Sequence, residues 1–197
     1  MQYLKDEVRN RISEAALQEF SEKGYLDASM RTIAAKAEVS LGNLYRYFKN
    51  KEELFNHLIE PIHSMLMDEG KVTDHNDIRT LYAIDSLERV TDYCLEFVGA
   101  YKTQLLILFH KSRGTKFESV REIMIQHVEQ DLRKSLLPEL HSRGIKINDE
   151  YIFHIMASTF MEGFFGILSK YQDEEQIKYL IRQLIFIYFY DITNRFK

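Results

Sequence analysis

The sequence has few residues that interrupt regular structure and almost none that form covalent or metal links. Two prolines and eight glycines in 197 residues are too few for the many tight turns of an all-β sandwich or barrel. The single cysteine, Cys94, has no second cysteine for an internal disulfide or a thiolate metal site, which is consistent with a reducing cytoplasm. The composition therefore favours a helical, cytoplasmic protein.

Long apolar stretches are also missing. The longest uninterrupted apolar run covers residues 184–190, far short of the roughly 20 residues that a helix needs to cross a bilayer. The first residues include the charged Lys5, Asp6 and Glu7, where a secretory signal peptide would be apolar. We therefore expect a soluble protein that is neither secreted nor embedded in a membrane.

The sequence lacks the residue patterns of a catalytic or cofactor site. No nucleophile with a neighbouring base and no glycine-rich phosphate loop is recognisable. Glu150 and His154 are four residues apart, on one face of a predicted helix, and His110 or His127 could join them as metal ligands. Two such residues are more often a surface pair or a hydrogen-bonded core histidine. We expect no metal, no cofactor and no enzymatic activity.

Charge is distributed unevenly along the chain. The net charge of −4 taken alone argues against nucleic-acid binding. Residues 1–51, however, contain nine Lys and Arg against seven Asp and Glu, whereas residues 52–197 contain seventeen against twenty-three. In residues 29–51 a single acid, Glu38, opposes five basic side chains, Arg31, Lys36, Arg46, Lys49 and Lys51. This local positive field suits a protein that binds DNA phosphates with one end.

Three segments near the N-terminus have the periodicity and capping residues of helices. Apolar residues recur at helical spacing in residues 4–23, and Gly24 follows where a left-handed C-terminal cap is expected. Ser29 and Ser40 each offer an N-cap oxygen to a short helix, at residues 30–37 and 41–48. These features predict a long helix followed by two short helices that a tight turn joins.

The remaining chain is also expected to be helical. A fourth helix follows residues 49–51, and Pro61 predicts a kink or break in it near Ile59 and Glu60. Residues 68–77 are polar and lack periodicity, so we place a domain boundary there. Further helices are predicted at residues 78–99, 101–112, 117–137, 149–170 and 174–194.

The two short helices have the pattern of a helix-turn-helix, with small Ala34 at the crossing and Val39 in the turn. In this arrangement the first helix supports the second, whose outward side chains enter the DNA major groove. The presented residues are Leu41, Gly42, Asn43 and Arg46. Arg can bind guanine and Asn can bind adenine, while Gly allows the backbone to approach the duplex. The candidates for phosphate contacts, which position the protein without reading sequence, are Tyr45, Tyr47, Lys49 and Lys51.

Residues 29–55, SMRTIAAKAEVSLGNLYRYFKNKEELF, resemble the signature of the TetR family of transcriptional regulators, and the similarity extends over residues 8–58. The resemblance implies an all-helical homodimer whose last two helices form a four-helix interface, and a small effector that alters DNA affinity. It also implies that Arg31 and the first turn of the second helix touch bases, whereas Tyr45, Tyr47 and Lys51 touch phosphates. The predicted DNA-binding set is completed by Ser29, Thr32 and Ser40.

The predicted fold class is therefore all-α, with a three-helix helix-turn-helix domain at residues 1–50, a connecting helix at 51–70 and a helical-bundle effector-binding and dimerisation domain at 71–197. We expect a cytoplasmic, sequence-specific transcriptional repressor. It would bind a pseudo-palindromic operator in double-stranded DNA. In the alternative hypothesis the C-terminal domain binds a protein partner. A closed internal cavity in that domain would favour the small ligand.

One residue departs from the family pattern. Glu38 occupies the turn position where the family usually has glycine, and a left-handed backbone there would cost a non-glycine residue about 1 kcal/mol. Glu38 also places an acid in the basic patch. We expect weaker phosphate binding or a slightly different turn, with the fold retained.

Six aromatic side chains and one methionine of the C-terminal part are candidates for lining a pocket that binds a small lipophilic or aromatic effector, although such residues more often form a core. They are Phe97, Tyr101, Phe109, Phe117, Met124, Phe160 and Phe164.

The last two predicted helices are apolar on more than one side, which one protomer could not cover alone. An obligate two-fold interface built from residues 149–194 is the simplest explanation, and Gly163 and Gly166 would allow close approach of a partner helix. A membrane-surface role lacks the basic polar face that it needs. The predicted interface residues are Phe153, Met156, Gly163, Ile167, Ile181, Leu184, Ile185 and Tyr188.

Overall fold

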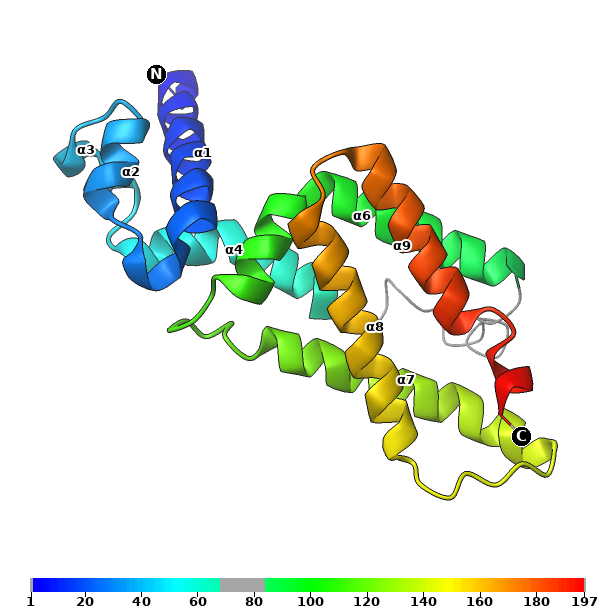
Figure 1. The fold of residues 1–197 in the computed structure, drawn as a ribbon. Coiled ribbons are helices and arrows are strands. Elements are labelled where there is room, and N and C mark those ends of the chain that lie inside the picture. Colours follow the sequence, from blue (N-terminus) through cyan, green and yellow to red (C-terminus); the bar gives the residue numbers. More distant parts are fainter. Residues whose placement is uncertain (1, 68–83, 197) are drawn as a thin grey trace. The chain divides into compact units, whose positions relative to one another are not determined.

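The computed structural model describes the backbone of residues 2–67 and 84–196 (Figure 1). Within these residues every regular element is helical and no strand occurs, so the predicted all-α class is confirmed. The α-helices are α1 (Gln2–Asp27), α2 (Met30–Lys36), α3 (Leu41–Tyr47), α4 (Lys51–Met67), α6 (Ile84–His110), α7 (Val120–Ser142), α8 (Tyr151–Lys170) and α9 (Glu174–Phe189), and a 3₁₀ helix, η2, covers Ile192–Arg195.

The chain divides into two compact units. The head unit comprises Met1–Met67 and Thr103–Ser119, and the body unit comprises Asp68–Lys102 and Val120–Lys197. The domain boundary predicted at residues 68–77 and the first residues of the helix predicted at 78–99 lie outside the described residues. The inclusion of Thr103–Ser119 in the head unit was not foreseen from the sequence.

α6 links the two units through a bend. The helices predicted at 78–99 and 101–112 form one element, in which Tyr101 alone has non-helical backbone angles, φ −130° and ψ 19°. One residue further along the chain, after Lys102, the body unit ends and the head unit resumes. Lys102 itself is held in the body unit, where its ammonium donates to the backbone oxygen of Tyr171 at 2.6 Å.

The core of the head unit is built from aromatic side chains of distant segments. Phe20 of α1 and Phe55 of α4 meet edge to face with their centroids 4.9 Å apart. Phe117, from the returning segment, packs against Phe55 at 6.2 Å. Gly24 bends the end of α1 with φ 75°, a backbone that glycine adopts without strain, and the next amide, of Tyr25, donates to the carbonyl of Lys111 at 2.9 Å.

α4 runs through Pro61 to Met67 without a break. Of the kink or break predicted near Ile59 and Glu60, the break was therefore wrong. Pro61 removes the donor that the carbonyl of His57 would use. Both residues are exposed, so this carbonyl can be hydrated and the helix continues.

The body unit is organised around α8, which contacts both α7 and α9. α7 and α8 share a core with η2, formed by Leu132, Leu136, Leu140, Phe153, Ala157 and Ile192. α9 begins where Asp173 accepts the amide of Gln176 at 2.7 Å, an N-cap that explains its start.

α8 also meets the length and composition of a membrane-crossing helix, with twenty residues and a mean hydropathy of 1.3. α8 does not contain a long uninterrupted apolar run, because polar residues such as Glu162 lie between its apolar residues. Its buried side chains are Phe153, Ala157, Met161, Phe165 and Leu168. A core helix of a water-soluble protein has the same properties, so this single helix is weak support for a membrane segment.

Candidate nucleic-acid interface

The helix-turn-helix consists of α2, a four-residue turn and α3. Ile33, Ala34 and Leu44 are buried and face the head core, which leaves the opposite sides of both helices at the surface. In the turn the amide of Val39 donates to the carbonyl of Ala34 at 3.0 Å. Since small Ala34 is almost inaccessible, the two helices cross closely there, as the sequence pattern predicted.

Glu38 adopts the left-handed conformation expected for the turn, with φ 56°. The predicted strain of about 1 kcal/mol relative to glycine therefore applies. Its side chain is 86% exposed and one oxygen lies 3.9 Å from the guanidinium of Arg11. An exposed ion pair of this length contributes little stability, so Glu38 adds negative charge near α3 without a strong internal partner.

The two predicted serine caps differ. The hydroxyl of Ser40 accepts the amide of Asn43 at 3.1 Å, which confirms the cap of α3. Ser29 has N-cap backbone angles but its side chain makes no capping hydrogen bond, so that part of the prediction was wrong. The amide of Ser29 instead donates to the Glu19 carboxylate of α1 at 3.3 Å, and the serine side chain lies exposed.

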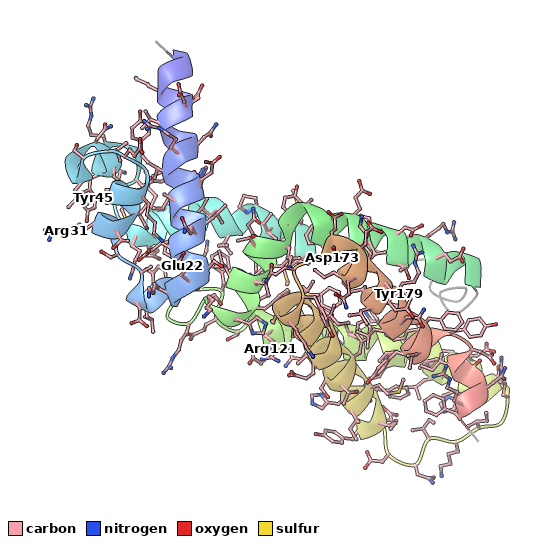
Figure 2. The ribbon with its side chains drawn as sticks, turned by 45° about the horizontal axis from the view of Figure 1, so that its top comes forward. Glu22, Arg31, Tyr45, Arg121, Asp173 and Tyr179 are labelled. Carbon is pink, nitrogen blue, oxygen red and sulfur yellow. The ribbon has the colours of Figure 1, made fainter. Side chains whose placement is uncertain are left out.

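The residues predicted to contact DNA lie on these two helices and the segment that follows. Figure 2 shows Arg31 on α2 and Tyr45 on α3. No atom approaches within 4 Å of the position that a Cβ on Gly42 would take, so the backbone there is open to a partner. The exposed members of the set are Ser29, Arg31, Thr32, Ser40, Gly42, Tyr45, Arg46 and Lys49, and the half-buried members are Leu41, Asn43, Tyr47 and Lys51.

Two of the five cations counted in the basic segment are engaged inside the head. The Lys36 ammonium lies 3.1 Å from carboxylate oxygens of both Glu19 and Glu22. The hydrogen bond to Glu19 raises the pKa of Lys36, and the hydrogen bond from Lys36 lowers the pKa of Glu22. Lys36 therefore adds little to the field that a phosphate would meet.

Lys51 is the second engaged cation. Its ammonium donates to the carbonyls of Leu26 at 2.9 Å and Ala28 at 3.1 Å, and it lies 4.8 Å from the centroid of the Tyr25 ring. Lys51 thus closes the C-terminal end of α1, and one of its three donors is left for a phosphate. Arg31, Arg46 and Lys49, by contrast, form no ion pair within the described part of the chain.

Sequence reasoning missed the residue that starts α4. The side chain of Asn50 accepts the amide of Glu53 at 2.7 Å, and the Glu53 carboxylate accepts the amide of Lys49 at 2.9 Å. This is close to a capping box, and the pattern Asn-x-x-Glu could have revealed it. The reciprocal bonds fix the backbone at Lys49.

A second cluster that the sequence did not reveal surrounds Phe48. The Arg9 guanidinium of α1 lies 5.5 Å from the centroid of the Phe48 ring, and the His57 ring lies 5.2 Å from it. Partial burial of the imidazole ring and the charge of Arg9 lower the pKa of His57. Arg9 lies exposed beside the end of α3.

The comparisons agree with this geometry. The family model described as "Bacterial regulatory proteins, tetR family" matches residues 12–58, which include α2, α3 and the first half of α4. The segment of residues 12–58 thus belongs to the TetR family. The relatives that the chain resembles are described as transcriptional regulators of the HTH type.

Relatives extend the similarity beyond the matched segment. The HTH-type transcriptional regulator YdgC of Bacillus subtilis is 33% identical over 94 residues, 44% of this chain and 48% of the relative. YhgD of the same organism is 28% identical over 138 residues, 68% of each chain. The matched stretch thus spans about half the length of YdgC.

Solved structures show that the whole fold is shared. One is MexZ, described as a key repressor responsible for antibiotic resistance in Pseudomonas aeruginosa. It is similar to this chain with a TM-score of 0.56 and 22% identity, over 90% of this chain and 92% of that one. TetR-like structures have an N-terminal helix-turn-helix and a helical C-terminal domain, which is the order of elements found here.

The residues predicted to line an effector site fall into both units. Phe109 and Phe117 belong to the head unit, and Phe117 packs against His63 with centroids 5.0 Å apart. In the body unit, Phe97 lies 5.1 Å from Tyr101. Phe160 contacts Phe164 and Phe189 at 6.4 Å and 4.8 Å, and Met124 is half-buried. The role of the body-unit residues in ligand binding stays a prediction.

The residues predicted for the dimer interface are also divided. Phe153, Ile181 and Ile185 are buried inside the body unit itself. Gly163 faces its own chain, since an added Cβ would lie 3.0 Å from Leu184 of α9. Met156, Ile167, Leu184 and Tyr188 are half-buried. The exposed apolar side chains of α8 and α9 are instead Tyr151, Ile152, Ile155, Tyr179, Phe186 and Ile187.

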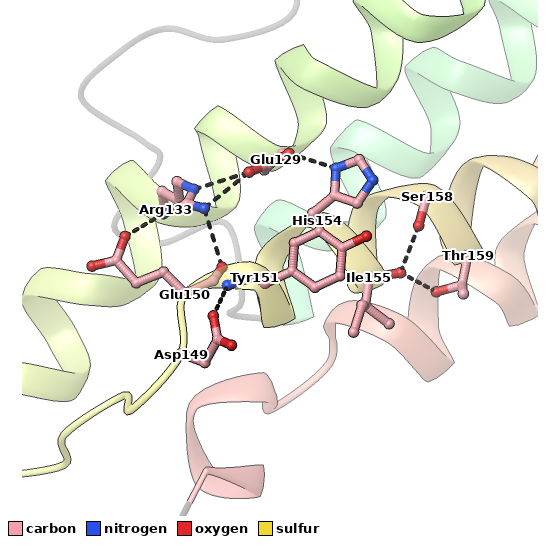
Figure 3. Close-up of polar contacts among 9 residues, drawn as sticks. All are labelled: Glu129, Arg133, Asp149, Glu150, Tyr151, His154, Ile155, Ser158 and Thr159. Atoms are coloured by element: carbon pink, nitrogen blue, oxygen red, sulfur yellow. Dashed lines mark hydrogen bonds and ion pairs between the residues drawn. The ribbon is translucent and has the colours of Figure 1, made fainter.

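The two residues first considered as metal ligands, Glu150 and His154, are engaged with other side chains (Figure 3). His154 lies 2.8 Å from Glu129 of α7, and Arg133 binds both Glu129 and Glu150. The hydrogen bond to His154 is the main cause that lowers the pKa of Glu129, followed by the one to Arg133. Among the described residues no group of three or more His, Cys, Asp or Glu side chains could hold a metal.

Proposed function

We propose that this protein is a TetR-family repressor that binds, as a homodimer, to a two-fold symmetric operator in double-stranded DNA. The observation that supports the proposal is the surface of α2 and α3, where Arg31, Arg46 and Lys49 are exposed beside the open backbone of Gly42 and form no ion pair with another described residue. In this proposal Arg46 would read a base and Lys49 would contact a phosphate.

Dimerisation would use the outer face of α8 and α9. Ile152 and Ile155 lie three residues apart on α8, and Tyr179 and Phe186 lie two turns apart on α9. With Tyr179 63% and Ile187 58% exposed, this face is too apolar for a stable monomer surface. A second copy that presents the same face would cover it symmetrically.

The dimer would place two copies of α3 in successive major-groove faces, about 34 to 36 Å apart or a multiple of that distance. A small lipophilic or aromatic effector in the body unit would favour a conformation with a different spacing, and its differential affinity would weaken operator binding by about 1 to 3 kcal/mol. In the second candidate function, a protein partner of the body unit takes the place of this effector.

The test is selection of bound sites from random DNA duplexes, followed by affinity measurements over a salt series. We expect a two-fold symmetric site. Arg46→Ala should lower discrimination at one base position by about 1 to 3 kcal/mol. Lys49→Ala should weaken binding to all duplexes and reduce the salt slope by about 0.9. Equal losses on operator and random DNA for Arg46→Ala would contradict base reading by this residue.

Lys51 is a poor probe of phosphate binding because it also holds the end of α1. Lys49→Ala is the better variant, since only the backbone amide of Lys49 is used inside the protein. Failure of the wild-type dimer to enrich any site at low salt would overturn the proposed function. A thermal-shift screen of the purified dimer then separates the two candidates for the body unit, because a small effector stabilises the protein without any partner protein.

A further inference from the structure

Glu19 is a buried carboxylate that the helix-turn-helix pattern does not predict. It lies on α1, is 3% exposed, and contacts α2 at both of its ends. One oxygen accepts the amide of Ser29, just before α2, at 3.3 Å, and the other lies 3.1 Å from the ammonium of Lys36, the last residue of α2. A single side chain thus ties the start and the end of this helix to α1.

α2 needs such fixation. A helix of seven residues is too short to be stable by itself. Its buried side chains are Met30, Ile33 and Ala34, which form a narrow apolar face. Apolar packing is not directional, so it can hold α2 against α1 without fixing how far the helix is rotated or shifted along its axis. Two directional bonds at opposite ends remove that freedom.

Stability alone gives a weak reason for this arrangement. A carboxylate and an ammonium lose hydration on burial, and a buried ion pair can often be replaced by apolar residues of similar volume without loss of stability. The residues that depend on the placement of α2 are Arg31 and Thr32 in its first turn, directly after the Ser29 contact. Side chains that read a partner must be held within about 0.5 Å of the productive position.

We propose that Glu19 is a positioning residue for sequence-specific DNA reading: by binding both ends of α2 it sets the position from which Arg31 contacts a base. The inference rests on the proposed function. Glu22 provides the matched comparison because its carboxylate lies at the same 3.1 Å from the Lys36 ammonium but is exposed and makes no contact with Ser29.

The experiment uses the full-length dimer and the operator that the wild type selects. Arg31→Ala first identifies the base position that Arg31 reads. Discrimination at that position, the salt slope and the midpoint of thermal unfolding are then measured for Glu19→Gln, for Glu22→Gln and for the double variant Glu19→Leu/Lys36→Met. The double variant replaces the buried pair by apolar groups and keeps a folded protein available if Glu19→Gln alone is unstable.

We expect the double variant to unfold at a temperature equal to or above that of the wild type, yet to lose discrimination at the Arg31 position by about fivefold or more, the lower end of what one base contact contributes. The salt slope should stay unchanged because no phosphate contact is lost. Glu22→Gln should retain discrimination within about twofold, as expected for an exposed pair.

A folded double variant that discriminates like the wild type would overturn the inference. So would a uniform loss of affinity for operator and random DNA, since that is the effect of a merely structural residue. Failure of the wild type to select any site is a distinct result, because it removes the proposed function itself before the variants are compared.

Discussion

The head unit and the body unit are both built from helices, but different kinds of contact hold the helices in place. In the head, directional contacts fix the helix ends: Glu19 on both ends of α2, Ser40 on α3, Asn50 and Glu53 on α4, and Lys51 on the end of α1. In the body, long helices pack through apolar cores. Fixed contacts suit a surface that must match the fixed geometry of DNA, whereas apolar packing tolerates changes of sequence and shape.

The surfaces of the two units also differ, in the number of large apolar side chains that they expose. Of the ten large apolar side chains that are exposed among the described residues, Leu26 and Tyr45 belong to the head, and the other eight belong to the body. The family model, in turn, matches residues 12–58, all of them in the head. The comparison teaches that the sequence shared with the family lies in the head, and that most of the exposed large apolar side chains lie in the body.

The largest expected effects come from the two cores, and they test whether the units are separate. Phe55→Ala in the head and Phe153→Ala in the body each remove a fully buried ring and should lower the free energy of unfolding by about 3 to 5 kcal/mol. Calorimetry should show that Phe55→Ala destabilises one thermal unfolding transition and Phe153→Ala another. If both variants shift one common transition by the same amount, the units unfold together and the comparison fails at the level of stability.

A smaller but still large effect should follow from charges on the proposed dimer face. Ile155→Glu with Phe186→Glu should convert the dimer to a monomer and weaken operator binding by about 30-fold or more, since loss of central interface residues costs about 2 kcal/mol or more. Analytical ultracentrifugation measures the assembly. Tyr93→Glu, which changes an exposed residue of α6, is the control, and a dimer that survives the double variant would place the interface elsewhere.

The turn of the head should respond more moderately. Glu38→Gly relieves about 1 to 2 kcal/mol of left-handed strain but gives the unfolded chain about 0.4 to 1 kcal/mol of extra freedom, so the gain should be about 1 kcal/mol or less. Denaturant unfolding measures it. Glu38→Gln keeps the strained backbone and removes the charge. Tighter DNA binding at low salt in both variants, with added stability in the glycine variant alone, would separate strain from charge.

The smallest effect concerns acid sensitivity of the body. The pKa of Glu129 is lowered from its ordinary value of 4.5 by His154 and Arg133. Its contribution to stability is therefore fully present above pH 4.5 and is lost as the pH falls through the lowered value. Glu129→Gln should remove this part of the acid dependence in unfolding experiments between neutral pH and pH 3. An unchanged acid profile would show that the contact with His154 is not maintained.

Much of the fold could be predicted because it depends on local signals. The two short helices and the cap at Ser40 follow from residues within four positions of one another, and the left-handed turn at Glu38 follows from the resemblance to the family. The structure agrees with each. The break at Pro61 did not follow, because a proline ends a helix only where the lost hydrogen bond has no substitute. Exposure to water supplies that substitute, and exposure is a property of the folded chain.

The surface of the site required the tertiary structure. The sequence counts Lys36 and Lys51 as part of a basic patch, but their partners lie 14 to 25 residues away in the chain, beyond any local pattern. The same holds for Glu19, whose burial depends on how α1 packs against α2.

The sequence by itself determined the helical class, the resemblance of residues 12–58 to the TetR family and the position of the two short helices, because helix periodicity, caps and the family signature act over short distances. The tertiary structure alone decided which cations of the head have partners inside it, which residues of α8 and α9 face outward, and that Thr103–Ser119 joins the head. α8 and α9 are apolar on more than one side, so their pattern cannot distinguish an inner from an outer face. Only packing against α7 and against each other makes that choice.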